Sequence, residues 1–150
     1  MDKSAKYFII GLKLGLLKSN DVQSWVDEQI DASDEPDEAL LDLAFIDNNN
    51  VKELVSKLSY IVDDRDDFEV IRILMAGIEE DRLSDVSFCS RLATDLYGFY
   101  VQHDYEVPDD FNEIGFFDDG YDLAKSGTYG TLDSWHNDFK NFAISFRNNS

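Results

Sequence analysis

Apolar residues recur at helical spacing along most of the chain. The clearest segment is residues 51–62, whose apolar positions share one helical face: Val51, Leu54, Val55, Leu58, Ile61 and Val62. Residues 5–17 are apolar nearly all round, which predicts a buried helix, and the spacing of Gly11 and Gly15 favours tight packing. No segment has the two-residue period of a strand, although residues 105–107 and 127–132 are short candidates for pairing. The pattern predicts an all-α chain of about seven to eight short helices.

Helix ends are predicted from capping residues. Three pairs have the spacing of a capping box: Asn20 with Gln23, Asn50 with Glu53, and Asp66 with Glu69. Pro36 is expected in the first turn of a helix whose buried stripe consists of Leu40, Leu41, Leu43 and Ala44. Ser84 is expected to cap a long helix over residues 86–103 that contributes much of the core.

The helical pattern weakens after Asp104 and returns near the C-terminus. Pro108 interrupts it, and Gly115 and Gly120 fall inside residues 109–123, which predicts a short helix or an irregular segment there. Apolar and aromatic residues at helical spacing predict a last helix over residues 132–146.

Length and composition indicate one folded domain, residues 1–150. The 43% of apolar residues are too many for a disordered chain, although 32 acidic residues against 13 basic ones give a formal charge of −19. Such a charge opposes compaction and repels nucleic acids and anionic membranes, whereas it attracts basic proteins. We expect a basic protein partner, no direct nucleic-acid partner and no membrane partner. The oligomeric state is left open.

The N-terminus and the single cysteine exclude several classes. The apolar run after Lys6 is broken by Lys13, and no cleavage site typical of a signal peptide follows it. No apolar stretch reaches the ~18 residues that span a bilayer. One cysteine, Cys89, cannot form an intramolecular disulfide. We therefore expect a cytoplasmic protein.

The sequence carries no catalytic motif. Cys89 lies on an apolar helix face, as a buried structural thiol does. His103 is expected at a helix end, and His136 on the surface beside the inward-facing Trp135. Acidic pairs arise from composition alone, and no calcium-loop or phosphate-loop spacing is complete. We predict no enzyme activity, no catalytic residue, no cofactor and no metal site.

Two acidic stretches without any lysine or arginine are the candidates for partner binding. In residues 104–122 the acids alternate with aromatic residues where helical regularity weakens, which is typical of a recognition surface. The predicted contacts are Asp104, Tyr105, Glu106, Asp109, Asp110, Phe111, Glu113, Phe117, Asp118, Asp119, Tyr121 and Asp122. Packing of these aromatics against the core is the alternative. In residues 21–47, Asp21, Asp37 and Glu38 are expected to favour the starts of helices. The predicted secondary contacts there are Asp27, Glu28, Asp31, Asp34 and Glu35.

Residues 14–44 resemble a known group of proteins. The matching elements are Gly15-Leu16-Leu17, Val22, Trp25-Val26-Asp27, Pro36 and Leu40-Leu41-Asp42-Leu43, with Val26 where that group has alanine. The run resembles small helical bacterial proteins found beside polymorphic toxins, including immunity proteins of contact-dependent growth inhibition systems. It covers about a fifth of the chain and consists of caps and core positions. The resemblance implies an inhibitor that occludes one cognate toxin domain, and it carries over no catalytic residue.

These observations give a leading hypothesis and two alternatives. The leading one is an immunity protein that neutralises a cognate basic toxin, a nuclease whose cleft binds phosphates through Lys and Arg. The first alternative is a nucleic-acid-mimicking inhibitor or adaptor outside any toxin system. The second is an acid-rich, metal-dependent hydrolase.

Overall fold

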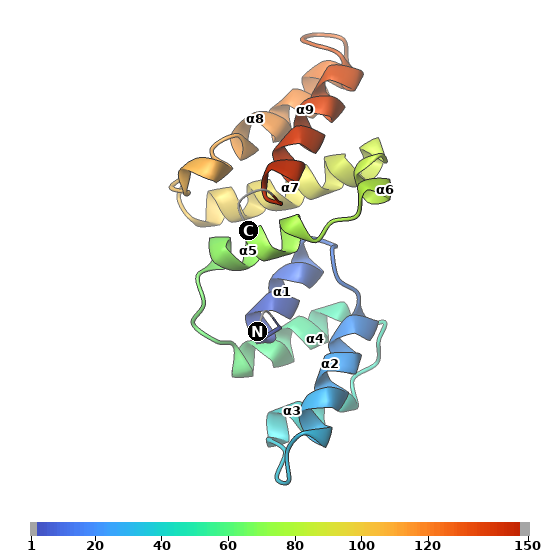
Figure 1. Ribbon diagram of the computed structural model, residues 1–150, viewed down its shortest axis with the longest axis vertical. Helices are drawn as coiled ribbons and strands as arrows, with labels where there is room; N and C mark the ends of the chain where they lie inside the picture. The colour runs from blue at the N-terminus through green and yellow to red at the C-terminus, as the bar shows by residue number, and fades with distance from the viewer. Residues whose placement is uncertain (1–2, 148–150) are drawn as a thin grey trace. The chain divides into compact units, whose positions relative to one another are not determined.

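The computed structural model describes residues 3–147, and every regular element within them is a helix. Residues 3–147 are 69% helical, and eight of the nine α-helices in this described part have seven or more residues (Figure 1). This confirms the all-α class. The two candidates for strand pairing, residues 105–107 and 127–132, contain no strand. In the described part of the chain, no helix combines the length and apolarity needed to cross a bilayer.

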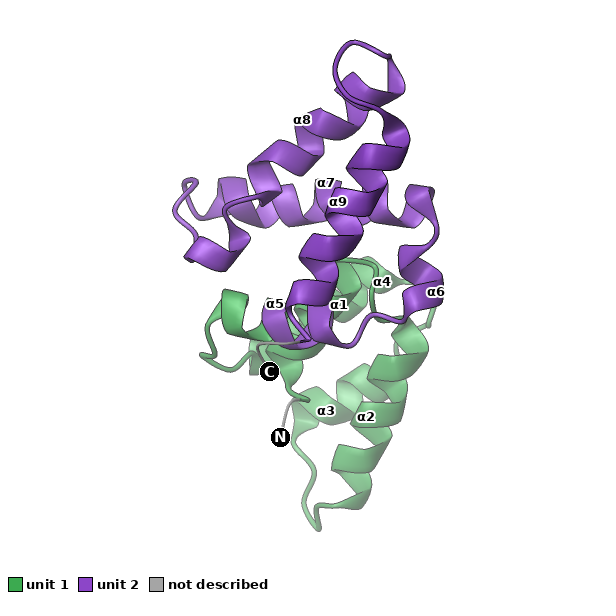
Figure 2. Cartoon of the chain, turned by 45° about the horizontal axis from the view of Figure 1, so that its top comes forward, with its two compact units in different colours: residues 1–71 green, residues 72–150 purple. Residues whose placement is uncertain are grey.

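The chain divides into two compact units, residues 1–71 and residues 72–150 (Figure 2). The boundary falls inside helix α5 (Asp67–Ala76), so that helix contributes residues to both units. The expectation of a single domain stays a prediction.

Unit 1 holds α1 (Ala5–Lys13), α2 (Ser19–Asp31), α3 (Glu38–Ala44), α4 (Val51–Leu58) and the short 3-10 helix η1 (Ser59–Ile61). Helix α3 contacts both α2 and α4, and α4 also contacts α1. Their apolar stripes meet in a mainly aliphatic core: Ala5, Phe8, Val22, Trp25, Val26, Leu43, Leu54 and Leu58. Burial of these stripes, rather than intrinsic propensity, holds such short helices together.

Helix α1 is shorter than the apolar run predicted, because Gly15 ends it. Gly15 has a φ of 68°, and its N–H and that of Leu16 donate to the carbonyls of Leu12 and Gly11. This is a Schellman motif, which favours glycine at the left-handed position. Gly11 has the predicted packing role, since a Cβ there would lie 2.3 Å from the Leu17 side chain.

The predicted caps of unit 1 are partly wrong. Helix α2 starts one residue before Asn20, and the Asp21 carboxylate accepts from the N–H of Lys18 at 2.7 Å. Gln23 instead donates its side-chain amide to the carbonyls of Leu43 and Ile46, at the end of α3. The Asn50 cap of α4 is confirmed, with the side-chain oxygen of Asn50 3.1 Å from the N–H of Glu53.

Helix α3 begins after Pro36 rather than containing it. The Asp37 carboxylate caps the helix by accepting from the N–H of Ala39 at 3.1 Å. Leu43 is fully buried, whereas Leu41 is 39% exposed. The prediction that Leu41 belongs to the buried stripe is therefore wrong, because α3 lies at the edge of the core and covers it with only one side.

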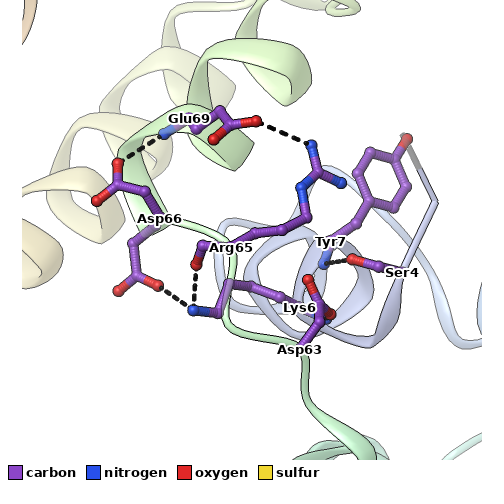
Figure 3. Close-up of polar contacts among 8 residues, drawn as sticks. Ser4, Lys6, Tyr7, Asp63, Arg65, Asp66 and Glu69 are labelled. Carbon is purple, nitrogen blue, oxygen red and sulfur yellow. Dashed lines mark hydrogen bonds and ion pairs between the residues drawn. The ribbon is translucent and has the colours of Figure 1, made fainter. Parts of the chain in front are cut away.

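Polar side chains from residues 63–69 complete the N-terminal end of α1 (Figure 3). Ser4 caps the N–H of Tyr7 at 3.3 Å, and the Asp63 carboxylate accepts from the N–H of Lys6 at 2.9 Å. The Lys6 ammonium donates to the Arg65 carbonyl and lies 3.3 Å from the Asp67 carboxylate. Two orphan N–H groups of the first turn thus find partners, one local and one 57 residues away.

Unit 2 holds the last part of α5, α6 (Glu80–Leu83), α7 (Val86–Gln102), the 3-10 helix η2 (Asp109–Phe111), α8 (Ile114–Lys125) and α9 (Leu132–Ser145). Helices α7, α8 and α9 contact one another pairwise. Between them lies an aromatic core: Phe111, Phe117, Trp135, Phe139, Phe142 and Phe146, with neighbouring ring centroids 5.0–6.2 Å apart.

One sequence expectation for unit 2 needs correction, and one open alternative is decided. Asp85, not Ser84, caps the long helix α7 by accepting from the N–H groups of Ser87 and Phe88. Of the two alternatives that the sequence left open for residues 109–123, a short helix or an irregular segment, the structure has a helix over residues 114–125. Gly120 lies inside it because a Cβ there would come within 3.2 Å of the Trp135 ring, so glycine allows α8 and α9 to approach closely.

Candidate protein-binding surface

Two adjoining hollows lie along helices α8 and α9 of unit 2. The larger, about 680 Å³, is lined by Asp109, Asp110, Glu113, Phe116, Phe117, Asp138, Asn141, Phe142 and Ser145. The second, about 430 Å³, is lined by Gly115, Phe116, Phe117, Asp119, Gly120, Leu123, Ala124, Tyr129, Gly130, Thr131, Ser134, Trp135 and Asp138. They share Phe116, Phe117 and Asp138. Together they form one surface, which we call the α8–α9 groove.

The aromatic core beneath gives the groove a rigid floor. Phe117 and Phe142 are 7% and 5% exposed; Phe117 lines both hollows, and Phe142 lines the larger one. The indole N–H of Trp135 donates to the carbonyl of Phe117 at 2.9 Å, which fixes α8 against α9. A site carried by packed helices of this kind keeps its shape before a partner arrives.

Phe116 stands on this floor as an exposed aromatic side chain. It is 77% exposed and lines both hollows. Tyr129 and Leu123, at the second hollow, are 77% and 39% exposed. Single exposed apolar side chains are common on protein surfaces. Three of them beside preformed hollows, however, match the anatomy of a binding surface.

The charges around the groove have one sign. Asp109, Glu113, Asp119 and Asp138 are exposed carboxylates, and no lysine or arginine is among the described residues that line either hollow. Asp110 differs, because Arg72 donates to its two carboxylate oxygens at 2.7 and 3.0 Å. This hydrogen-bonded pair lowers the pKa of Asp110 despite its partial burial. The groove therefore presents a negative potential to a cation, mainly from the four other carboxylates.

The structure gathers only part of the predicted binding stretch into the groove. Asp109, Asp110, Glu113, Phe117 and Asp119 line it. Phe111 is fully buried against the Phe146 ring, at a centroid distance of 5.0 Å, so its prediction as a partner contact is wrong. Phe117 is also a core residue, since it is only 7% exposed. Phe111 and Phe117 therefore agree with the alternative interpretation, in which the aromatic residues pack the segment against the core.

Asp104, Tyr105 and Glu106 lie at the end of α7. The N–H groups of Asp104 and Tyr105 donate to the carbonyls of Val101 and Tyr100, which is again a Schellman motif. Asp104 and Tyr105 have φ values of 57° and 64°. Tyr105 is 58% exposed and contacts the Tyr100 ring edge-on at 5.2 Å. These residues remain accessible to a partner but do not line the groove.

Of the other predicted contacts on α8, two side chains are half-buried against the protein and one is exposed to solvent. Tyr121 is half-buried on Trp135, at a ring distance of 5.0 Å, and Asp122 is exposed. Asp118 is half-buried, and burial together with the neighbouring Asp119 carboxylate raises its pKa, although Thr94 gives it a hydrogen bond. An acid held at this position costs stability at neutral pH rather than adding to it.

Among the groove residues that sequence reasoning missed are its three exposed apolar side chains and one carboxylate: Phe116, Leu123, Tyr129 and Asp138. For Asp138 a signal exists, since it lies three residues after Trp135 and four before Phe142 on α9 and so borders the buried face. Phe116 is not distinguishable from its neighbour Phe117 by residue type. Only the packing of α8 decides which of the two rings is buried.

The secondary contacts of unit 1 are exposed carboxylates without a capping role. Asp27, Glu28, Asp31, Asp34 and Glu35 lie in or after the last turns of α2, where no base opposes them. Negative charge there opposes the helix dipole. Asp21 and Asp37 do bind backbone N–H groups at helix starts, as predicted.

The groups considered for catalysis have structural surroundings. Cys89 is buried, and burial raises its thiol pKa to about 11, with Asp85 adding to the effect. His103 is at the C-terminal end of α7, as expected. His136 is half-buried rather than on the surface, with its Nε2 2.7 Å from the Leu83 carbonyl oxygen. Within residues 3–147, no three His, Cys, Asp or Glu side chains are grouped to hold a metal ion.

Comparison of the chain with protein-family models, curated proteins and solved structures gave no match.

Proposed function

We propose that the chain is an immunity-type inhibitor that binds a basic toxin domain through the α8–α9 groove and occludes it. The observation that supports the proposal is the pairing of preformed hollows with the exposed Phe116 ring and carboxylates of one sign. The resemblance of residues 14–44 to immunity proteins points to the same class of function. In this proposal the protein acts in the cytoplasm and performs no catalysis.

The chemistry favours a nuclease as the toxin. A nuclease cleft is lined with Lys and Arg that bind phosphates, and exposed carboxylates such as Asp109 and Glu113 replace phosphates in that role. Phe116 would fill an apolar pocket near the centre of the interface, where aromatic anchors contribute most of the affinity. The formal charge of −19 adds long-range attraction to a basic partner.

The first experiment is a pull-down of the full chain against the product of the adjacent upstream gene, followed by a binding measurement. We expect a stable complex that inhibits the toxin. Association should slow by about an order of magnitude or more as ionic strength rises from about 0.01 to 0.5 M, because salt screens the steering field. An on-rate that stays constant over this range would contradict the electrostatic part of the proposal.

Variants then locate the interface. Phe116→Gln, or Asp109→Lys combined with Glu113→Lys, should weaken binding at least about tenfold and leave the fold intact, because all three side chains are exposed. Asp110 is a poor test position, since its replacement breaks the ion pair with Arg72. The matched control is Asp34→Lys with Glu35→Lys in unit 1, which makes the same change in net charge. If the control abolished binding and the groove variants did not, the interface would lie in unit 1.

A further inference from the structure

The outer face of α3 in unit 1 is a second exposed apolar surface. Glu38, Leu41, Asp42 and Phe45 have the spacing i, i+3, i+4 and i+7, so they share the face opposite the buried Leu43. Phe45, at the C-terminal end, is 88% exposed, and Leu41 is 39% exposed. Two apolar side chains thus stand one helical turn apart with a carboxylate on either side of Leu41. We call these four residues the α3 face.

A hollow of about 340 Å³ adjoins this face. It is lined by Asp37, Glu38, Ala39, Asp42, Lys57 and Tyr60, and therefore shares Glu38 and Asp42 with the α3 face. Tyr60 is 75% exposed, and the Lys57 ammonium lies 5.7 Å from the centre of its ring. Lys57 already covers the Tyr60 ring, but the three carboxylates of the hollow outnumber its single ammonium, so the hollow attracts the head group of a further lysine or arginine.

The charge of the surrounding stretch selects the occupant. Residues 21–47 contain ten carboxylates and no lysine or arginine. A second copy of the chain and an anionic membrane would both be repelled, whereas a cation would be attracted. The occupant must therefore be basic around an apolar centre.

The geometry selects the form of the occupant. The α3 face is a helix surface, whose backbone groups are already hydrogen-bonded, so it offers no edge for a partner strand. Leu41 and Phe45 are four residues apart, or about 6 Å along the axis, which matches the spacing of apolar side chains on another helix.

We propose that the α3 face binds a cationic amphipathic helix of a partner protein. Apolar residues of that helix contact Leu41 and Phe45, and one of its Lys or Arg side chains enters the adjoining hollow. This surface belongs to unit 1 and is separate in residues from the α8–α9 groove. The proposal stands whether or not the partner of the groove is a toxin.

The test is an NMR titration of the full chain with a synthetic amphipathic helix built from Leu and Lys. We expect amide shifts to concentrate in residues 38–45 and 57–60, with a saturable one-site curve for that region. Leu41→Gln combined with Phe45→Gln should weaken this binding at least about tenfold, as truncation of interface anchors does. Circular dichroism should remain unchanged, because the replaced side chains are exposed and glutamine favours helices.

Phe116→Gln in the groove is the matched control, since it removes one exposed aromatic ring from the other unit. It should leave the titration of residues 38–45 unchanged. The proposal is overturned if the double variant binds the peptide as the wild type does, or if a scrambled peptide of the same composition binds equally well. It is also overturned if sedimentation without peptide shows a dimer that the double variant abolishes. These outcomes concern unit 1 alone, whereas failure of the groove variants to weaken toxin binding counts against the proposed function.

Discussion

The two units carry similar charge on different cores. Acidic residues exceed basic ones to nearly the same extent in residues 1–71 and 72–150, and each unit contains one tryptophan. The core of unit 1 is mainly aliphatic around Phe8 and Trp25, whose rings are 5.0 Å apart. The core of unit 2 is a continuous cluster of aromatic rings, and most of the aromatic residues of the chain belong to this unit.

This difference shows that negative charge alone does not locate a binding surface. Both units carry a net negative charge, so charge favours a basic partner but does not determine the position of contact. The positions are set by apolar side chains that packing leaves exposed: Phe116 over the α8–α9 groove, and Leu41 with Phe45 on the α3 face. The groove has a built floor and two hollows, which favours it as the principal site.

The largest expected effect comes from breaking the aromatic core of unit 2. Phe139 is fully buried between Trp135, Phe117 and Phe142, and Phe139→Ala should destabilise unit 2 by about 3–5 kcal/mol. Denaturant unfolding is followed by fluorescence in two backgrounds, Trp25→Phe and Trp135→Phe, so that each unit keeps its own reporter. We expect the transition reported by Trp135 to move to lower denaturant while that of Trp25 stays in place.

The same measurement tests the number of domains. Leu54→Ala, at a fully buried position of unit 1, is the reciprocal variant and should move the Trp25 transition by about 2–5 kcal/mol. Equal movement of both transitions in both variants would instead show that the units unfold as one cooperative domain.

The next effect concerns the non-local cap of α1. Asp63→Asn should destabilise unit 1 by about 1 kcal/mol at pH 7, because a charged acceptor at the helix N-terminus is lost. Although burial acts to raise it, hydrogen bonds including that from the Lys6 N–H lower the pKa of Asp63. Its contribution is therefore present above the ordinary value of 3.8 and disappears as the pH falls below it. The difference in unfolding free energy between wild type and variant should shrink over that range, and a constant difference would contradict this role.

The two Schellman motifs allow a smaller test between the units. Gly15 at the end of α1 and Asp104 at the end of α7 hold equivalent left-handed positions. Gly15→Ala should destabilise by about 1 kcal/mol, and Asp104→Gly should stabilise by about 0.5–1 kcal/mol, because the left-handed conformation strains residues with a side chain. Urea unfolding midpoints measure both. If Asp104→Gly also weakens toxin binding, the strained aspartate is kept for recognition.

The smallest effect concerns Asp118. Its pKa is raised, so the folded state favours the protonated acid and loses stability as the pH rises through the raised pKa. Asp118→Asn should therefore increase the melting temperature slightly at pH 7 and leave it unchanged near pH 3. Asp119→Asn is the control, which should lower the pKa of Asp118 and reduce that difference. A melting temperature lowered at pH 7 would contradict this interpretation.

Sequence by itself determined the helical class, several helix starts and the sign of the surface charge. Periodic apolar residues and local caps such as Asn50 act within a few positions of one another, so they can be recognised without a fold. The one-residue distinction between Phe116 and Phe117, by contrast, follows from which side of α8 meets α9.

Tertiary structure also decided the features that join distant segments. The Asp63 cap of α1, the pairing of Asp110 with Arg72 and the contact of Gly120 with Trp135 link residues far apart in the chain. Gly115 and Gly120 left a short helix or an irregular segment open; a helix forms there, because the packing of α8 against α9 at Gly120 outweighs the weak helix propensity of glycine. The two proposed binding surfaces consist of side chains that this packing leaves uncovered, and for that reason the hydrophobic pattern alone did not reveal them.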